Sequence, residues 1–316
     1  MSTKTPQFPS LYVPDDVIRD YAPRTQEFMQ LGALAGLPHA NADATKGALV
    51  IIDMQNDFVR PNGALSVPHA EDDVRRLVEF IYTNASHITA IYATLDSHYP
   101  LQIFYSEWWE NPQTLEHPAP FTVITADDIK NGVYRACIDP VWSHEYVYAL
   151  ARLGRNALMI WPKHTMIGTW GHNIVPALYE AIAWHSAARK TLPVYLTKGD
   201  VPQTERYGAF ASEVEYLRNP RGGTDSAVLE AIAKFKRTWW AGEAKTHCLI
   251  ESQKQAVGFV AANPNLKSVL NTMYFLTDCT SPILHPTIDF DGAANAELTR
   301  MAALGVKLVR STDPIN

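Results

Sequence analysis

The chain has 316 residues, of which 47% are hydrophobic and 19% are charged, and its formal net charge is −6. This composition is typical of a globular protein, and a negative charge without any Lys/Arg block argues against binding to nucleic acid. No apolar run reaches the length of a membrane span, and the N-terminus lacks a signal-peptide core. The three cysteines, Cys137, Cys248 and Cys279, have no CxxC spacing and do not suggest a disulfide framework, so we expect a cytoplasmic protein.

Residues 1–45 are predicted to form an N-terminal extension. Prolines are frequent at its start, and one helix is predicted from Asp15 to about Leu37, although Pro23 interrupts its loose apolar periodicity. We expect this extension to pack as an arm on the main domain, which would comprise residues 46–316.

From Lys46 onward, segments with strand and helix patterns alternate. The aliphatic run Ala48–Ile52 is typical of a strand buried on both faces, and residues 71–84 carry apolar side chains at helical spacing. Further strands are predicted at 87–98 and 157–161. The alternation continues to the C-terminus. It predicts one α/β domain with a doubly wound, Rossmann-like, mostly parallel six-stranded sheet that helices cover on both faces.

Residues 99–156 are too long for an ordinary strand-to-helix connection. Insertions at the carboxyl end of such a sheet often form a wall or lid over a pocket, and this segment holds three tryptophans and several prolines. We therefore predict a lid-like insertion, with a contact between subunits of an oligomer as the alternative.

A cysteine follows one of the predicted strands at the start of a helix. The apolar, aromatic run 238–241, predicted as a strand, reaches Gly242, a short polar turn follows, and Cys248 opens an amphipathic segment. A thiol beside the unpaired N–H groups of a helix N-terminus is favoured in its thiolate form, and the same groups could receive an oxyanion. The alternative is that Cys248 is a small buried hydrophobe.

Two charged residues, Asp53 and Lys198, end other strands of the same predicted sheet. Ligands gather beyond the carboxyl ends of the strands in such sheets, so both side chains are expected near Cys248. A carboxylate could take the thiol proton and hand it to a leaving nitrogen, and a lysine would orient that carboxylate. Taken singly, Asp53 could cap a loop and Lys198 could be a surface charge. The three residues together predict a catalytic site.

An Asp-x-His pair, Asp96 and His98, ends another predicted strand. Alternate residues of an extended segment point to the same side, so both side chains can reach one ion. His164, after the strand predicted at 157–161, would complete three ligands and leave positions open for water or substrate. The alternative for His98 is a loop residue without a ligand role, since the chain has eleven histidines.

The order and context of these residues resemble the isochorismatase-like cysteine hydrolases, and within them the nicotinamidases. The matching segments run from about Lys46 to the C-terminus and are, in order, ALVIIDMQNDF, TLDSHYP, IWPKHTMIGTWG, VYLTKGDVPQTERYGAF and GEAKTHC. The resemblance places the three catalytic residues at Asp53, Lys198 and Cys248. It places the three metal ligands at Asp96, His98 and His164.

The resemblance implies a reaction, the hydrolysis of nicotinamide to nicotinate and ammonia. The Cys248 thiolate would attack the carboxamide, and Asp53 would protonate the departing ammonia and later activate water to hydrolyse the thioester. The Glu243–Ala244 peptide bond would be cis, with the oxyanion held by the N–H groups of Ala244 and Cys248. A divalent metal, zinc or alternatively iron or manganese, would bind the ring nitrogen, and Phe58 would flank the ring. The expected partner is thus a small-molecule carboxamide, and the family suggests a homo-oligomer.

Several residues depart from the pattern of this family. Glu243 stands where a valine is usual, Thr246 where an aspartate is common, and Thr165 where many nicotinamidases have a cysteine. Together with the long insertion, these differences leave the substrate open, and another carboxamide or a ureido compound is the first alternative. A non-catalytic small-molecule-binding protein of the same fold is the second, although the three catalytic residues are all retained.

Overall fold

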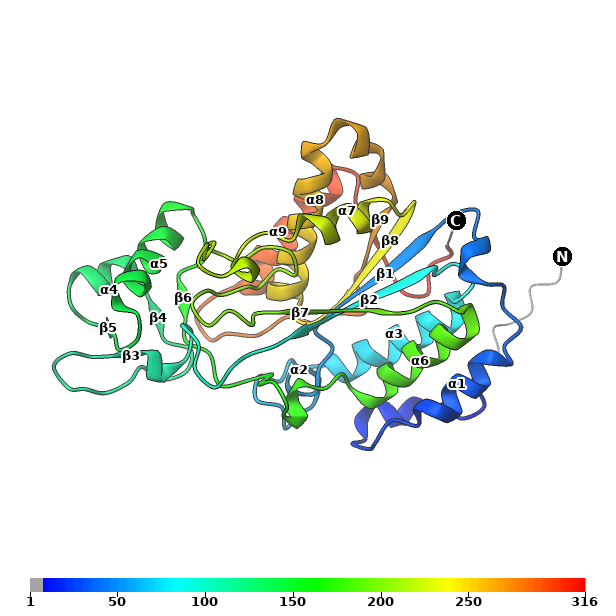
Figure 1. Cartoon of the computed structure of the whole chain (residues 1–316), viewed down its shortest axis with the longest axis horizontal. Coiled ribbons are helices and arrows are strands. Elements are labelled where there is room, and N and C mark those ends of the chain that lie inside the picture. The colour runs from blue at the N-terminus through cyan, green and yellow to red at the C-terminus, as the bar shows by residue number, and fades with distance from the viewer. Residues whose placement is uncertain (1–7, 316) are drawn as a thin grey trace.

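A six-stranded sheet forms the centre of the molecule, with its strands in the order β10-β9-β8-β1-β2-β7 (Figure 1). The computed structural model describes residues 8–315. The strands are β1 (Gly47–Ile52), β2 (Ala90–Asp96), β7 (Val194–Lys198), β8 (Arg237–Gly242), β9 (Met273–Leu276) and β10 (Lys307–Val309). Every pairing between neighbouring strands is parallel, which confirms the predicted doubly wound α/β sheet.

Helices cover both faces of this sheet (Figure 1). One face carries α1 (Thr25–Ala33), α3 (Ala70–Asn84) and α6 (Pro176–Arg189), and the other carries α7 (Ser226–Ala233), α8 (Ile250–Ala262) and α9 (Phe290–Ala303). Successive side chains of β1 point to opposite faces, so Leu49 packs in the core with α3 and α6 whereas Val50 packs in the core with α7 and α8. All of β1 is buried, as its continuous apolar sequence predicts. Within residues 8–315, none of the helices has both the length and the apolar character that a membrane span needs.

In place of the single helix predicted over 15–37, the N-terminal extension has a short 3-10 helix and a separate α-helix. Pro14–Ile18 forms a 3-10 helix, and α1 follows only at Thr25. The prediction was wrong because Pro23, which cannot donate a helical hydrogen bond, lies just before α1. α1 packs closely on α6 because Gly32 has no side chain: an added Cβ would lie 2.3 Å from the carbonyl oxygen of Trp184.

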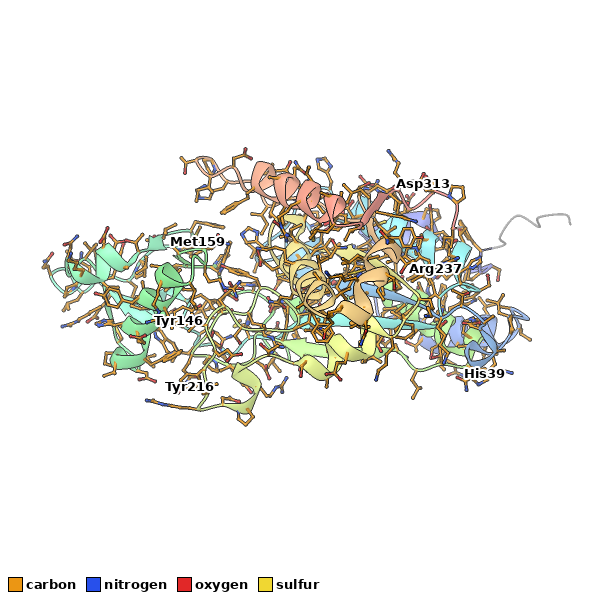
Figure 2. All side chains as sticks on the ribbon, turned by 90° about the horizontal axis from the view of Figure 1, so that it is seen from above. His39, Tyr146, Met159, Tyr216, Arg237 and Asp313 are labelled. Carbon is orange, nitrogen blue, oxygen red and sulfur yellow. The ribbon has the colours of Figure 1, made fainter. Side chains whose placement is uncertain are left out.

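Residues 99–156, here called the insertion lobe, lie beyond the carboxyl ends of the strands at one end of the molecule (Figures 1 and 2). The lobe contains β3 (Trp109–Glu110), β4 (Val123–Ile124), α4 (Ala126–Lys130), β5 (Arg135–Ala136) and α5 (Pro140–Arg152). Its α5 packs against the loop that follows β7. There the Trp142 indole N–H donates to the Gln203 carbonyl at 2.7 Å, and its ring centroid lies 4.9 Å from that of Tyr216.

The strand predicted at 157–161 does not belong to the main sheet, so that prediction was wrong. Only Leu158–Met159 is extended and paired, as β6, and its antiparallel partner is β4 of the insertion lobe. The run ends at Pro162, which has no N–H for a ladder. The place beside β2 is taken by β7 instead. His164 therefore lies in a loop and not at the end of a sheet strand.

Arg24 ties the N-terminal extension to α6. Its Nε lies 2.9 Å from Glu180 Oε1, and its Nη2 lies 2.6 Å from Asp16 Oδ2. Glu180 is only 1% exposed. Because Arg24→Ala leaves this buried carboxylate without its cation, we expect the free energy of unfolding to fall by about 3 kcal/mol. Urea denaturation measures the change.

The matched control is Arg300→Ala, which removes an arginine that pairs at 2.6 Å with Glu297 on the surface of α9. Exposed pairs contribute little, so this change should cost less than about 1 kcal/mol. Equal effects of the two substitutions would contradict the role of Arg24 as a buried anchor.

Candidate active site

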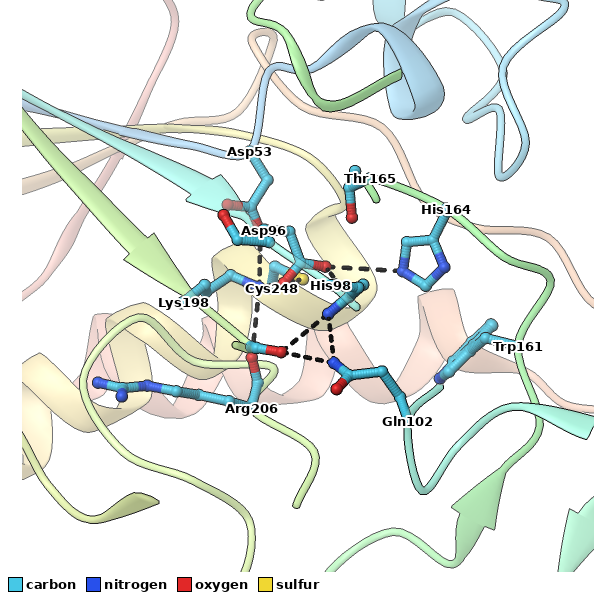
Figure 3. Close-up of polar contacts among 12 residues, drawn as sticks. Asp53, Asp96, His98, Gln102, Trp161, His164, Thr165, Lys198, Arg206 and Cys248 are labelled. Carbon is cyan, nitrogen blue, oxygen red and sulfur yellow. Dashed lines mark hydrogen bonds and ion pairs between the residues drawn. The ribbon is translucent and has the colours of Figure 1, made fainter. Parts of the chain in front are cut away.

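Four side chains meet where β8, β1, β2 and β7 end, at the carboxyl edge of the sheet (Figure 3). Asp53 follows β1, Asp96 ends β2, Lys198 ends β7, and Cys248 lies in the turn after β8. They converge because the carboxyl ends of parallel strands share one edge. None of the four is more than 7% exposed.

Lys198 is the shared contact of this group. Its Nζ lies 2.8 Å from Asp53 Oδ2, 2.8 Å from Asp96 Oδ1 and 3.5 Å from Cys248 Sγ. A carboxylate oxygen of each aspartate and the Cys248 sulfur all lie within 4.8 Å of one another. The structure thus brings together the three residues that the sequence proposed as catalytic, with one buried cation between two carboxylates and a thiol.

Asp53 is held in place by the neighbouring strand β2. Its φ of 47° puts it in the left-handed region, which a non-glycine residue seldom adopts. Its N–H donates to Thr94 Oγ1 at 3.0 Å, and the Thr94 hydroxyl donates to Asp53 Oδ1. These contacts occupy one carboxylate oxygen and leave the other facing Lys198.

Burial is the largest single influence on the pKa values of Cys248, Asp53 and Asp96, although it does not decide the direction for all three. It raises the pKa of the Cys248 thiol well above its ordinary value, although the charge of Lys198 acts in the opposite direction. Burial also raises the pKa of Asp53 by more than Lys198 lowers it. For Asp96, burial is outweighed by the charges of His98 and Lys198, which bring its pKa well below the ordinary range. The surroundings of Asp96 therefore favour its anionic form, and those of Asp53 favour its protonated form.

Cys248 lies in a π-helical turn, Lys245–Leu249, ahead of the regular helix α8. The sequence suggested that the cysteine opens a helix whose N-terminus favours the thiolate. Cys248 does lie in the first turn of a helical segment, but burial of the sulfur raises the pKa of the thiol by more than the charge of Lys198 lowers it and so favours the protonated form.

The turn before Cys248 presents a free backbone N–H to the site. The Glu243–Ala244 peptide bond is cis, and Gly242 has a φ of 131°. Gly242 is required there because an added Cβ would lie 2.1 Å from the carbonyl oxygen of Ile52. Among residues 8–315, the Ala244 N–H has no hydrogen-bond acceptor. This N–H can therefore receive an oxygen of a bound molecule.

Asp96, His98 and His164 form a second buried cluster. Asp96 Oδ2 lies 2.9 Å from His98 Nε2 and 3.6 Å from His164 Nε2. The other ring nitrogen of each histidine meets a backbone carbonyl, that of Gly199 at 3.0 Å for His98 and that of Pro162 at 2.7 Å for His164. A carbonyl accepts only from N–H, so Nδ1 of each ring carries a proton, and Nε2, which faces the carboxylate, is the nitrogen that a metal can bind once it is unprotonated. The three side chains therefore fit a divalent metal, with one oxygen and two nitrogen ligands.

Two aromatic residues of the insertion lobe contact the histidines of this cluster. The Tyr105 hydroxyl donates to the His164 carbonyl at 3.2 Å, and the Phe104 ring centroid lies 4.9 Å from that of His98. These contacts position the loop that carries His164, which the sequence had placed at a strand end.

A pocket with mostly aromatic walls opens beside Cys248 and the His/Asp cluster. Its wall is formed mainly by Phe58, Trp161, Tyr207, His247 and Ile283. Phe58 belongs to α2 (Asn56–Val59), and its ring meets that of His164 edge-on with centroids 5.5 Å apart. Within the described chain, no residue of the insertion lobe lines the pocket. The lobe therefore contributes to the site by supporting the pocket wall.

Sequence reasoning missed three polar residues of the site: Gln55, Gln102 and Glu205. Gln55 holds the backbone of Asp96, accepting from its N–H at 2.8 Å and donating to its carbonyl at 2.8 Å. Gln102 donates to the Gly199 carbonyl at 2.6 Å, beside the ring of His98. Glu205 lines the pocket, and burial raises its pKa to about 7. The one available signal was that each lies a few positions after a strand-end residue.

Comparison with known proteins finds nicotinamidases among the similar sequences and structures. No protein-family model matches the chain. The nicotinamidase of Saccharomyces cerevisiae is 22% identical over 165 residues, which is 51% of this chain and 61% of that protein. The crystal structure of yeast nicotinamidase bound to the inhibitor nicotinaldehyde superposes with a TM-score of 0.55 at 20% identity, covering 84% of this chain and 99% of the other. An Acinetobacter nicotinamidase/pyrazinamidase gives 0.54 at 19% identity, with coverages of 84% and 97%.

These similarities show that the chain has the nicotinamidase fold, a six-stranded parallel sheet covered by helices. The resemblance found in the sequence motifs is thereby confirmed at the level of the fold. The matched sequence spans about three-fifths of the yeast relative's length.

The His/Asp cluster predicts metal binding that depends on His164. We expect the parent protein, dialysed against zinc, to retain about one equivalent, and His164→Ala to bind at least about tenfold more weakly because one of three ligands is lost. Bound metal is measured by elemental analysis.

The matched control is His172→Ala. His172 lies close by, but its Nε2 pairs with the Ser97 hydroxyl at 2.8 Å and it is not part of the cluster, so the variant should keep its metal. Equal metal contents in all three proteins would contradict the assignment of a metal site.

Proposed function

We propose that this protein is a cysteine-dependent amidohydrolase of the nicotinamidase kind, acting on a small carboxamide, with nicotinamide as the leading substrate. The observation that carries the proposal is the Lys198 ammonium, which contacts Asp53, Asp96 and Cys248 at once in a buried pocket. Cys248 would be the nucleophile, Asp53 would carry the proton, and Lys198 would hold both side chains in place.

The first half of the reaction forms a covalent intermediate. The Cys248 thiol is protonated at rest, so it needs a base, and Asp53 is the carboxylate whose raised pKa suits it to take that proton. The sulfur then attacks the carboxamide carbon. The negative charge that develops on the oxygen is received by backbone N–H groups of the nucleophile turn, that of Ala244 among them.

The second half releases the products. Asp53 gives its proton to the departing nitrogen, ammonia leaves, and the acyl group remains on Cys248 as a thioester. Asp53 next takes a proton from a water molecule that attacks the thioester carbon, and returns it to the sulfur as the carboxylic acid leaves. Lys198 stays charged throughout and compensates the negative charge of the cluster.

A divalent metal would be held by Asp96, His98 and His164. Zinc is the leading candidate, with iron and manganese as alternatives, because one carboxylate and two imidazoles suit all three. When bound, such a metal would supply a Lewis-acid contact for a ring nitrogen of the substrate. The chain's own contribution to ring binding is the aromatic wall, in which Phe58 and Trp161 can enclose a flat heterocycle.

The leading substrate follows from the pocket and from the relatives together. The yeast and Acinetobacter proteins are named as nicotinamidases, and the yeast structure contains nicotinaldehyde, a flat pyridine compound. A pyridine carboxamide has both the ring that the aromatic wall suits and the amide that Cys248 would attack.

Cys248→Ala should abolish ammonia release from nicotinamide. Loss of the nucleophile is expected to lower kcat by at least about a thousandfold, because no other group in the pocket can form the acyl intermediate. The measurement is a coupled ammonia assay on the metal-loaded protein.

Cys279→Ala is the matched control, since Cys279 is equally buried but lies outside the pocket. It should keep most of the parent activity. Residual turnover by Cys248→Ala near the parent rate would contradict the mechanism. In the same assay benzamide, which lacks the ring nitrogen, should be a poorer substrate, and ureido compounds test the alternative substrate class.

A further inference from the structure

Glu243 points into the protein interior and away from the pocket. It directly follows β8, is 0% exposed and does not line the pocket, whereas its neighbour Ala244 does. Its own N–H donates to the Ile52 carbonyl at 2.8 Å. A glutamate without solvent contact, in the turn that carries Ala244, requires partners for its carboxyl group.

Ser281 connects this carboxyl group to α3. The Ser281 N–H donates to Glu243 Oε2 at 3.2 Å, and the Ser281 hydroxyl donates to Asp73 Oδ2 at 2.5 Å. The Ser281 carbonyl accepts from the Lys245 N–H at 2.9 Å. Ser281 therefore contacts the residues on both sides of Ala244, and it joins the turn to Asp73.

The buried carboxyl groups of Glu243 and Asp73 both contact Ser281, and one nearby cation, Arg76, pairs with Asp73. Asp73 is 1% exposed, and its Oδ1 lies 2.6 Å from Arg76 Nη2. Two ionised carboxylates beside a single guanidinium would leave one negative charge uncompensated in the interior. Asp73 already accepts from Arg76 and from the serine hydroxyl, whereas Glu243 Oε1 has no partner in the described part of the chain. Of the two carboxyl groups, Glu243 is therefore the one that can carry a proton, on its free Oε1 and within hydrogen-bonding reach of Asp73.

The other charged and titratable groups around the pair do not supply a second cation. They are Asp278 and Cys279 in the loop after β9, Arg310 after β10, and Lys245 in the nucleophile turn. Arg310 lies 3.7 Å from Asp278, and Lys245 lies 2.5 Å from Asp291 of α9. Burial, and then the neighbouring aspartate carboxylate, raise the pKa of Glu243 well above its ordinary value.

We propose that Glu243 is a positioning residue that remains a neutral acid, shares its proton with Asp73, and through Ser281 fixes the Ala244 N–H toward the pocket. Loss of the proton would place two carboxylates side by side and weaken the Ser281 contacts on either side of Ala244. The role of Ala244 rests on the proposed function, but the shared proton does not depend on turnover.

The proton is tested by melting temperature against pH, with the parent protein compared to Glu243→Gln. The folded state holds the proton to higher pH than the unfolded chain. The stabilisation is therefore full below about pH 4.3, the ordinary value for glutamate, and is lost as the pH rises toward the folded pKa. Glutamine is neutral at every pH and can donate to Asp73. The parent should therefore lose at least about 3 °C relative to the variant between about pH 5 and pH 9.

The matched control is Glu230→Gln, which changes an exposed glutamate on α7. The melting temperatures of this variant and of the parent should differ by the same amount throughout this pH range. If the melting-temperature difference between Glu243→Gln and the parent is also independent of pH, Glu243 is ionised in the folded protein and the proposal is overturned. If Glu243→Gln does not fold, Asp73→Asn tests the same proton. Its amide donates to an ionised Glu243, so the melting temperature of the parent should again fall relative to that of the variant as the pH rises, and a difference that stays constant overturns the proposal.

The positioning role is tested by kinetics on the metal-loaded protein. Glu243→Ala should lower kcat by about tenfold and leave KM within about twofold, because the oxyanion contact acts in the transition state. Glu243→Gln should restore most of kcat. Equal losses in the two variants, or a change in KM alone, would overturn the role. If the parent releases ammonia from no amide, the proposed function fails, while the melting comparison still decides where the proton lies.

Discussion

The ammonium group of Lys198, buried between two carboxylates and a thiol, is the interaction on which the rest of the site depends. A cation without solvent contact is costly unless oppositely charged groups surround it at hydrogen-bond distance. Here the partners come from the ends of β1 and β2 and from the turn after β8, so the ion cluster requires these strands and β7 to end at the same edge of one parallel sheet. The contacts of the pocket therefore depend on the order of the strands in the sheet.

The two aspartates that share this lysine differ in ionisation because their surroundings differ. Asp96 faces two histidines as well as the lysine, and the charges of His98 and Lys198, with the hydrogen bond to His164, outweigh its burial and lower its pKa. Asp53 has only the lysine and Thr94, so burial prevails and raises its pKa. In the proposed mechanism, their surroundings thus suit Asp96 to hold a metal and Asp53 to transfer a proton, although the side chains are chemically identical.

The sequence predicted the features that depend on short local patterns. Asp53, Asp96 and Lys198 each end an apolar run, so the strands and their meeting at one edge could be predicted. Features set by distant contacts could not be. The strand at β6 was misplaced because its partner β4 lies in the insertion lobe. The ionisation of Cys248 was misjudged because burial depends on the whole pocket, and the partners of Glu243 lie on α3 and after β9.

The proposed mechanism requires Cys248 to carry the acyl group during turnover, and rapid quenching in acid followed by mass spectrometry can detect that group on the protein. The metal-loaded protein, in excess over nicotinamide, should show an acyl group on the peptide that contains Cys248, and ammonia should appear before nicotinate. Nicotinate that forms in step with ammonia, with no acyl group on Cys248 or with one on another residue, would contradict the account.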